Sequence, residues 1–200
     1  MRIDELTGYK SNPVYRDTQA IFKNQPPGEQ WSLEYDRPEQ LAAFTKYMNA
    51  RGFTRLGRGN YGVVYEKPGY PWVFKVFKQD PAYMHFLEYA IAHQDNPNLP
   101  QVRGRPIKIN DTTYAVRLEK LTPLSDADAD VYEEIEDMAI LIVDNRSYTQ
   151  EILDSLKEKY PGIARIFQDM NASKYELDIS TKNIMRRGNT LVIIDPIFSF

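Results

Sequence analysis

The 200-residue chain has no cysteine and only two histidines, His85 and His93. A disulfide scaffold and thiolate chemistry are therefore excluded, and a zinc site would need carboxylates to complete its ligand set. The two histidines lie eight residues apart in one predicted helix, where we expect them to serve in packing or on the surface. A metal ion held by oxygen ligands is compatible with this composition.

The sequence also lacks long apolar runs and an excess of positive charge. No stretch approaches the roughly 20 apolar residues that cross a bilayer, and the N-terminus has no apolar run typical of a signal peptide. The 25 basic and 28 acidic residues give a net charge of −3, which is not typical of a dedicated nucleic-acid binder. We therefore expect a soluble intracellular protein with no membrane association and no direct nucleic-acid binding.

The order of the predicted elements indicates an α+β protein with two lobes. Residues 1–38 read as an irregular N-terminal extension. Residues 39–121 read as a lobe in which two helices accompany an antiparallel sheet, and residues 122–200 as a reduced helical lobe with one late hairpin. The helices are predicted at 38–51, 81–94, 125–142, 149–160 and 163–171, and the strands at 53–57, 62–67, 72–78, 105–110, 112–120, 183–187 and 190–195.

The segment GRGNYGVV places Gly57, Gly59 and Gly62 in a G-x-G-x-x-G-x-V pattern between two predicted strands. Glycines allow backbone amides to approach phosphate oxygens, although a plain hairpin turn would also use two of them. A dinucleotide-binding loop would continue into a helix, and a Walker A loop would have lysine in place of Val63. A glycine-rich loop between two strands is the form that protein kinases use.

The next strand, WVFKVFK, supplies the lysine that such a loop requires. Lys75 shares a strand face with Val73, and we expect its side chain to reach the phosphates rather than to be a solvated edge lysine. The predicted helix that follows carries a single acid, Glu88, among apolar neighbours. An acid in apolar surroundings is costly unless it is paired, so we expect Glu88 to orient Lys75, with an exposed glutamate as the alternative.

The segment LDISTKNIMRRGNTLVIIDP near the end of the chain completes the pattern. Asp178 and Asn183 form D-x-x-x-x-N, and a hairpin of β-prone residues then leads to Asp195 after an apolar strand. Asp178 would position an acceptor hydroxyl or accept its proton, while Asn183 and Asp195 offer the oxygen ligands that Mg²⁺ prefers. We expect Lys182, Arg186 and Arg187 to be solvated in the hairpin, with phosphate or substrate contact as the alternative.

Together, GRGNYGVV, VFK, DISTKN and IIDP resemble a compact protein-kinase-like fold over roughly residues 53–200. The phrases GFTRLGRGNYGVVYEKPGYPWVFKVFK, NIM and DPIFSF resemble more closely the kinase domain of the early serine/threonine protein kinases of T7-like bacteriophages. That family implies ATP and Mg²⁺ as cofactors, and phosphorylation of host proteins of transcription, RNA processing and translation in the bacterial cytoplasm.

The resemblance also implies roles for individual residues. The three glycines would cover the ATP phosphates with Lys75 in contact, Asp178 would be the catalytic aspartate, and Asn183 with Asp195 would hold Mg²⁺. The adenine would lie near Leu56, Val64, Glu119, Lys120 and Leu121.

Several departures from the kinase pattern keep alternatives open. Glu176 and Leu177 replace the histidine and arginine that precede the kinase catalytic aspartate, and Pro196 follows the metal aspartate where kinases have phenylalanine. Because the chain leaves no room for an activation loop, we expect no control through one. The first alternative is an inactive pseudokinase that binds and inhibits a host protein, with the acidic stretch 126–137 as its candidate docking face. The second alternative is a small-molecule phosphotransferase.

Overall fold

The computed structural model describes residues 20, 38–59, 62–144 and 150–199, so most of the predicted extension 1–38 lies outside the described residues. Two compact units are present: Met1–Asp80 with Val102–Lys120, and Pro81–Gln101 with Leu121–Phe200. Five helices and antiparallel sheets make up the described residues, which confirms the α+β class. No helix in this part of the chain is long and apolar enough to cross a membrane.

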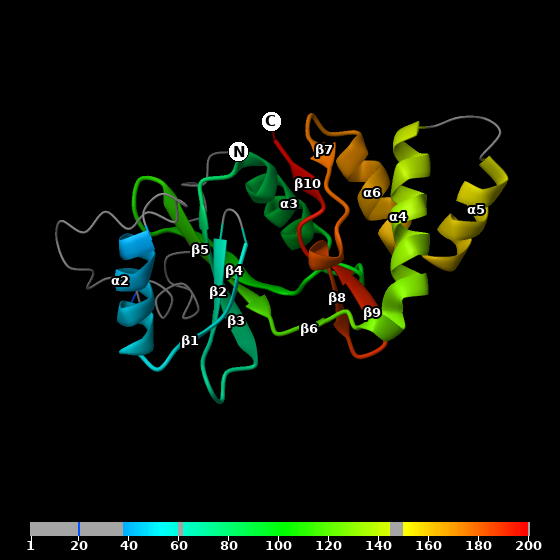
Figure 1. The fold of residues 1–200 in the computed structure, drawn as a ribbon. Helices are drawn as coiled ribbons and strands as arrows, with labels where there is room; N and C mark the ends of the chain where they lie inside the picture. Colours follow the sequence, from blue (N-terminus) through cyan, green and yellow to red (C-terminus); the bar gives the residue numbers. More distant parts are fainter. Residues whose placement is uncertain (1–19, 21–37, 60–61, 145–149, 200) are drawn as a thin grey trace. The chain divides into compact units, whose positions relative to one another are not determined.

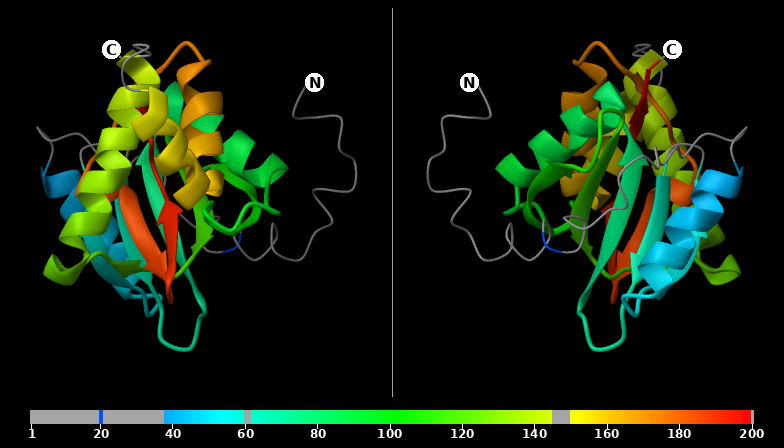
Figure 2. Two further views of the ribbon diagram at one scale, coloured as in Figure 1. Left: turned by 90° about the vertical axis from the view of Figure 1, so that its right-hand side faces the viewer. Right: turned by 90° about the vertical axis from the view of Figure 1, so that its left-hand side faces the viewer.

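The first unit is built on a five-stranded antiparallel sheet with one helix on it (Figures 1 and 2). Its elements are α2 (Pro38–Asn49), β1 (Thr54–Arg58), β2 (Gly62–Glu66), β3 (Trp72–Lys78), β4 (Val102–Lys108) and β5 (Thr113–Glu119). The strand order β1-β2-β3-β5-β4 makes β3 the central strand. The apolar core between α2 and the sheet contains Leu41, Phe44, Met48, Phe53, Val63, Tyr65, Phe74, Val76, Ile107 and Ala115.

Helix α2 confirms the prediction made from its sequence. Pro38 is its first residue, where the missing N–H has no intrahelical partner to lose. Gly52 has a φ of 80°, and its N–H donates to Asn49 O at 2.9 Å. Glycine tolerates this left-handed conformation without steric cost, so it ends the helix and turns the chain toward β1.

The second unit contains four helices and three short strand pairings (Figure 1). Its helices are α3 (Pro81–Ala92), α4 (Ala129–Asp144), α5 (Gln150–Lys159) and α6 (Pro161–Asn171). Its strands are β6 (Thr122–Pro123), β7 (Glu176–Leu177), β8 (Ile184–Arg187), β9 (Thr190–Ile193) and β10 (Ile197–Phe198). Helices α4, α5 and α6 pack on one another, and β8 lies between β6 and β9.

The structure differs from the predicted organisation in three respects. Residues 81–101 group with the second unit rather than with the rest of 39–121, because α3 packs on β10. The predicted break between two helices is present, but α6 begins at Pro161 rather than at 163, because proline suits the first turn of a helix. Strands β6, β7 and β10 were missed, since a two-residue strand has no periodicity to detect.

Candidate functional site

The three glycines of the predicted phosphate loop lie at the β1–β2 connection of the first unit. The Gly59 N–H donates to Gly62 O at 2.9 Å. A Cβ on Gly62 would lie 3.1 Å from the Val76 carbonyl oxygen, whereas a Cβ on Gly57 or Gly59 would meet no described residue within 4 Å. Close packing of β2 on β3 therefore requires Gly62. The space beside Gly57 and Gly59 is open toward the described residues, which leaves room for a ligand there.

Lys75 lies in β3, the central strand of the sheet. The strand register places it between Val64 of β2 and Val116 of β5. The residues on either side of it along β3 belong to the core beneath α2, so the Lys75 side chain lies on the opposite face. Its Cε is 3.5 Å from a Cβ built on Gly62. The structure thus brings the predicted lysine next to the third glycine of the predicted loop.

The five residues predicted to surround adenine are distributed over both units. Lys120, the last residue of the first unit, pairs with Glu66. Leu56, at an irregularity in the β1–β2 pairing, is 49% exposed. Val64 is half-buried beside Lys75, and Glu119 ends β5. Leu121 is the first residue of the returning segment of the second unit. The strand register places Val64 next to Lys75, and the adenine contacts stay predictions.

Glu88 lies on α3, in the second unit, and its side chain is exposed. The buried face of α3 is formed instead by Ala82, Tyr83, Phe86, Leu87 and Ala90. An exposed carboxylate keeps its water and needs no cation to offset burial. The burial argument for a Glu88–Lys75 pair therefore carries no weight, and the pair stays a prediction.

Asp178, Asn183 and Asp195 are brought together in the second unit by three hydrogen bonds. The Asp178 N–H donates to Pro196 O at 2.7 Å, next to Asp195 and beside the β7–β10 pairing. Asn183 Nδ2 donates to Asp178 O at 2.9 Å. The Ile194 N–H donates to Asn183 O at 2.8 Å, which extends the β8–β9 pairing. The three predicted residues thus lie together in one small hydrogen-bonded cluster.

The exposure of these residues suits contact with a ligand. Asp178 is exposed, while Asn183 and Asp195 are half-buried. Because the Asn183 amide nitrogen donates to Asp178 O, its Oδ1 is left as an acceptor. An amide oxygen and a carboxylate are ligands that Mg²⁺ takes, together with water and phosphate oxygens. Within the described residues no group of three or more His, Asp or Glu could hold a metal ion.

The histidines take packing roles, as expected. The His85 ring lies 5.5 Å from the Tyr175 ring. His93 Nδ1 is 2.9 Å from Tyr89 O, one turn earlier in α3, and the two rings are 4.2 Å apart.

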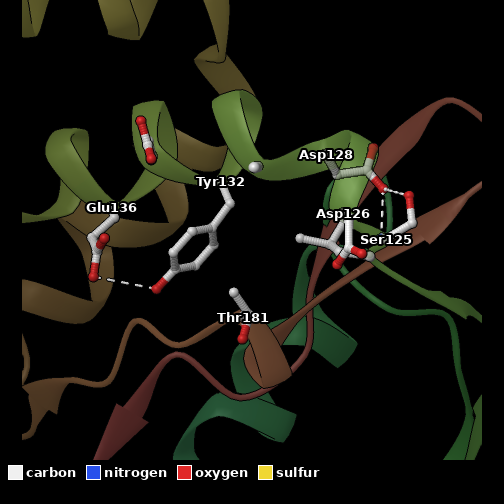
Figure 3. A pocket seen from close by; sticks show the side chains of 9 residues that line it. Ser125, Asp126, Asp128, Tyr132, Glu136 and Thr181 are labelled. Atoms are coloured by element: carbon white, nitrogen blue, oxygen red, sulfur yellow. Dashed lines mark hydrogen bonds between the residues drawn. The ribbon is translucent and has the colours of Figure 1, made fainter.

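A cavity of about 280 Å³ lies between the start of α4 and Thr181 (Figure 3). The Tyr132 hydroxyl, in its lining, donates to Glu136 Oε1 at 3.2 Å, one turn further along α4. Burial, then the negative charges of Glu136 and Asp178, raise the pKa of Tyr132. The carboxylates that line the cavity are Asp126, Asp128, Glu133 and Glu136. Such a lining repels a triphosphate, so this cavity is not our candidate for the nucleotide.

Sequence reasoning missed the residues that hold the hairpin. Arg186 Nε donates to Asp128 Oδ1 at 2.8 Å, and Arg187 donates to Pro97 O at 2.9 Å and to Leu99 O at 3.0 Å. Both arginines are half-buried, so the expectation that they are solvated is wrong. The signal was present in the sequence: consecutive residues of a strand point to opposite sides, and two arginines in succession can therefore contact two different neighbours.

Comparison of the chain with protein-family models and with curated proteins found no match.

Proposed function

We propose that the chain is a protein kinase that transfers the γ-phosphoryl group of ATP, with Mg²⁺, to serine or threonine hydroxyls of host proteins. The observation that carries this proposal is the hydrogen-bonded cluster that contains Asp178, Asn183 and Asp195. Phosphoryl transfer needs a group that orients the nucleophile and oxygen ligands for a metal ion, held at fixed spacing. In this proposal Asp178 is the orienting group, and Asn183 and Asp195 are the oxygen ligands.

Asp178 is the proposed catalytic residue. Its carboxylate is exposed, so an acceptor hydroxyl can reach it, while its backbone N–H and C=O are both engaged in the hydrogen bonds described above. A carboxylate on a fixed backbone can accept a hydrogen bond from the hydroxyl and keep its oxygen in line with the phosphorus. Asp178 thereby orients the acceptor and takes its proton as the new bond forms.

Asn183 and Asp195 are the proposed metal ligands. Their donor atoms, one amide oxygen and the carboxylate oxygens, match the preference of Mg²⁺ for oxygen. Bound there, Mg²⁺ would neutralise negative charge on the phosphates. The β8–β9 pairing and the bond from Ile194 N–H to Asn183 O hold the backbones of the two ligands together.

Lys75, Gly57 and Gly59 are the proposed phosphate contacts of the first unit. Lys75 is half-buried on the sheet face opposite α2, with its Cε close to the Gly62 backbone. An ammonium group there can pair with phosphate oxygens, and the open space beside Gly57 and Gly59 lets a phosphate approach the backbone of this connection. Val64, which is beside Lys75 in the register, offers apolar surface to the base.

The substrates follow from the resemblance to the early kinases of T7-like bacteriophages. We propose that the protein acts in the cytoplasm of an infected bacterium, on host proteins of transcription, RNA processing or translation. The motifs that support this assignment are GRGNYGVV, the Lys75 strand, DISTKN and IIDP.

The test is phosphorylation of bacterial proteins by the purified full chain. Radiolabelled ATP, Mg²⁺ and a lysate are incubated with the wild type, Asp178→Asn, Asp195→Ala and Lys75→Met, and labelled proteins are hydrolysed to identify the phosphoamino acids. We expect phosphoserine and phosphothreonine with the wild type, and a loss of at least about 100-fold in each variant.

Glu176→Gln is the matched control, because it removes an exposed carboxylate two residues from Asp178. It should keep the wild-type rate. If the wild type labels nothing, yet wild type and Asp178→Asn capture the same host protein, the chain is an inactive kinase-like binder. Label found only on small molecules would make it a small-molecule phosphotransferase.

A further inference from the structure

Asp128 is the only buried acidic residue among those that the structure describes, with 9% of its surface exposed. Its Oδ2 accepts hydrogen bonds from the Ser125 N–H at 2.8 Å and from Ser125 Oγ at 2.9 Å. Its Oδ1 accepts from Arg186 Nε at 2.8 Å and also from Arg186 Nη2. Four donors thus fix the carboxylate in position, and both partners of the ion pair are largely removed from solvent.

The Asp128–Arg186 pair connects two elements that are distant in the sequence. Asp128 ends the 3₁₀ turn that leads into α4. Arg186 lies in β8, three residues after Asn183, and β8 pairs with β9, which leads to Asp195. The position of Arg186 is therefore coupled to Asn183 along β8, and to Asp195 through the pairing of β8 with β9.

The segment from Asp178 to Asn183 has little apolar packing of its own. Asp178, Thr181 and Lys182 are exposed, and none of the residues from 178 to 183 is buried. Segments with few buried contacts open readily unless neighbouring structure holds them. The firm attachments lie just beyond it, at Arg186 and at Arg187, which donates to the carbonyl oxygens of Pro97 and Leu99.

We infer that Asp128 and Arg186 are positioning residues that hold Asn183 and Asp195 at the spacing phosphoryl transfer requires. This inference rests on the proposed function. Neither residue needs to touch the substrate: the ion pair fixes β8 against the start of α4, and β8 fixes the ligands. Residues that orient metal ligands in this way typically change activity by about 10- to 100-fold when they are replaced.

The test compares Asp128→Asn, Arg186→Lys and the double variant in the full-length protein. Arg186→Lys keeps the charge but cannot form the two-pronged contact with a carboxylate oxygen, and it is the variant to use if Asp128→Asn does not fold. We expect kcat to fall about 10- to 100-fold with KM for ATP changed less than about threefold. The double variant should be no slower than the slower single variant, because both changes remove one interaction.

Backbone amide hydrogen exchange gives a readout that does not depend on activity. We expect the amides of residues 178–195 to exchange faster in Asp128→Asn and Arg186→Lys. Glu134→Gln is the control: Glu134 is also on α4, and it pairs with Lys159 rather than with the hairpin. It should leave kcat and exchange at residues 178–195 within about twofold of the wild type.

Unchanged kcat in folded Arg186→Lys, or unchanged exchange at residues 178–195, overturns the inference. A fall in thermal stability with normal kcat below the melting temperature would likewise make the pair merely structural and overturn it. If the wild type transfers no phosphate at all, the proposed function fails separately. The exchange experiment then still decides whether the pair orders this segment.

Discussion

The two units hold their candidate functional residues by different means. In the first unit Lys75 is carried by the central strand of a five-stranded sheet whose opposite face is packed against α2. In the second unit Asp178 and Asn183 lie in a segment with no buried residue, held by hydrogen bonds to the backbone and by the arginines of β8. The position of Lys75 therefore depends on the packing of apolar side chains in the core, whereas the position of Asp178 depends on hydrogen bonds.

This difference predicts which changes each unit tolerates. Apolar packing is insensitive to pH but sensitive to the loss of a few carbon atoms. A hydrogen-bonded segment is sensitive to small displacements and to the protonation of its charged groups. Four changes test the contrast, beginning with the largest expected effect.

Phe74→Ala should damage the first unit most. The Phe74 ring is fully buried, 5.3 Å from the Phe53 ring and 5.0 Å from the Trp72 ring. Its removal leaves a cavity and should lower the free energy of unfolding by about 3–5 kcal/mol, measured by urea denaturation. Leu56→Ala, at a position 49% exposed, is the control and should cost less than about 0.5 kcal/mol. Equal losses would show that packing beneath α2 does not stabilise this unit.

Gly162→Ala should damage the second unit through a single methyl group. A Cβ there would lie 2.1 Å from Asn98 Oδ1 and 2.8 Å from Asn96 Oδ1. Asn98 Nδ2 donates to Leu191 O of β9 at 2.8 Å, so the amide cannot move away without breaking a bond to the hairpin. We expect a loss of about 1–3 kcal/mol in urea denaturation. Gly57→Ala, which meets no described residue within 4 Å, should be nearly neutral, and a comparable loss there would contradict the steric explanation.

The same contrast decides how much of the protein could be predicted from its sequence. The apolar periodicity of α2 and the β-prone residues of β3 were sufficient to predict these two elements of the first unit, because both contribute to a single core. In the second unit the hairpin was predicted, but β7 and β10 are two residues long and gave no pattern.

The sequence predicted some residues of the candidate site but not the contacts that hold them in place. Asp178, Asn183 and Asp195 were found from their spacing, and the structure brings them together. The contact between Asp128 and Arg186 spans 58 residues, and no local pattern indicates which distant acid a given arginine meets. Glu88 shows the converse error, since apolar neighbours in the sequence did not mean burial of the acid itself.

Acid should weaken the second unit through Asp128. Hydrogen bonds from Arg186, then from Ser125, lower the pKa of Asp128 from 3.8 to about 2. Because the folded-state pKa is lower than the unfolded one, this contribution to stability is complete above pH 4 and is lost as the pH falls from about 4 to about 2. The urea midpoint of the wild type should drop over that range, and the drop should be smaller in Asp128→Asn. Parallel pH profiles would contradict the assignment.

Asp111→Ala should have the smallest effect, although it also removes an ion pair. Lys108 Nζ lies 3.4 Å from Asp111 Oδ1, and the two side chains are 53% and 101% exposed, against 24% and 12% for Arg186 and Asp128. Water solvates both groups of the exposed pair, so its loss should change the free energy of unfolding by less than about 0.5 kcal/mol at neutral pH. Urea denaturation at low and high salt measures this. A larger loss of unfolding free energy that does not depend on salt would mean that solvent exposure does not determine how much each ion pair stabilises the protein. The Asp128–Arg186 pair would then be important only because it lies beside the hairpin.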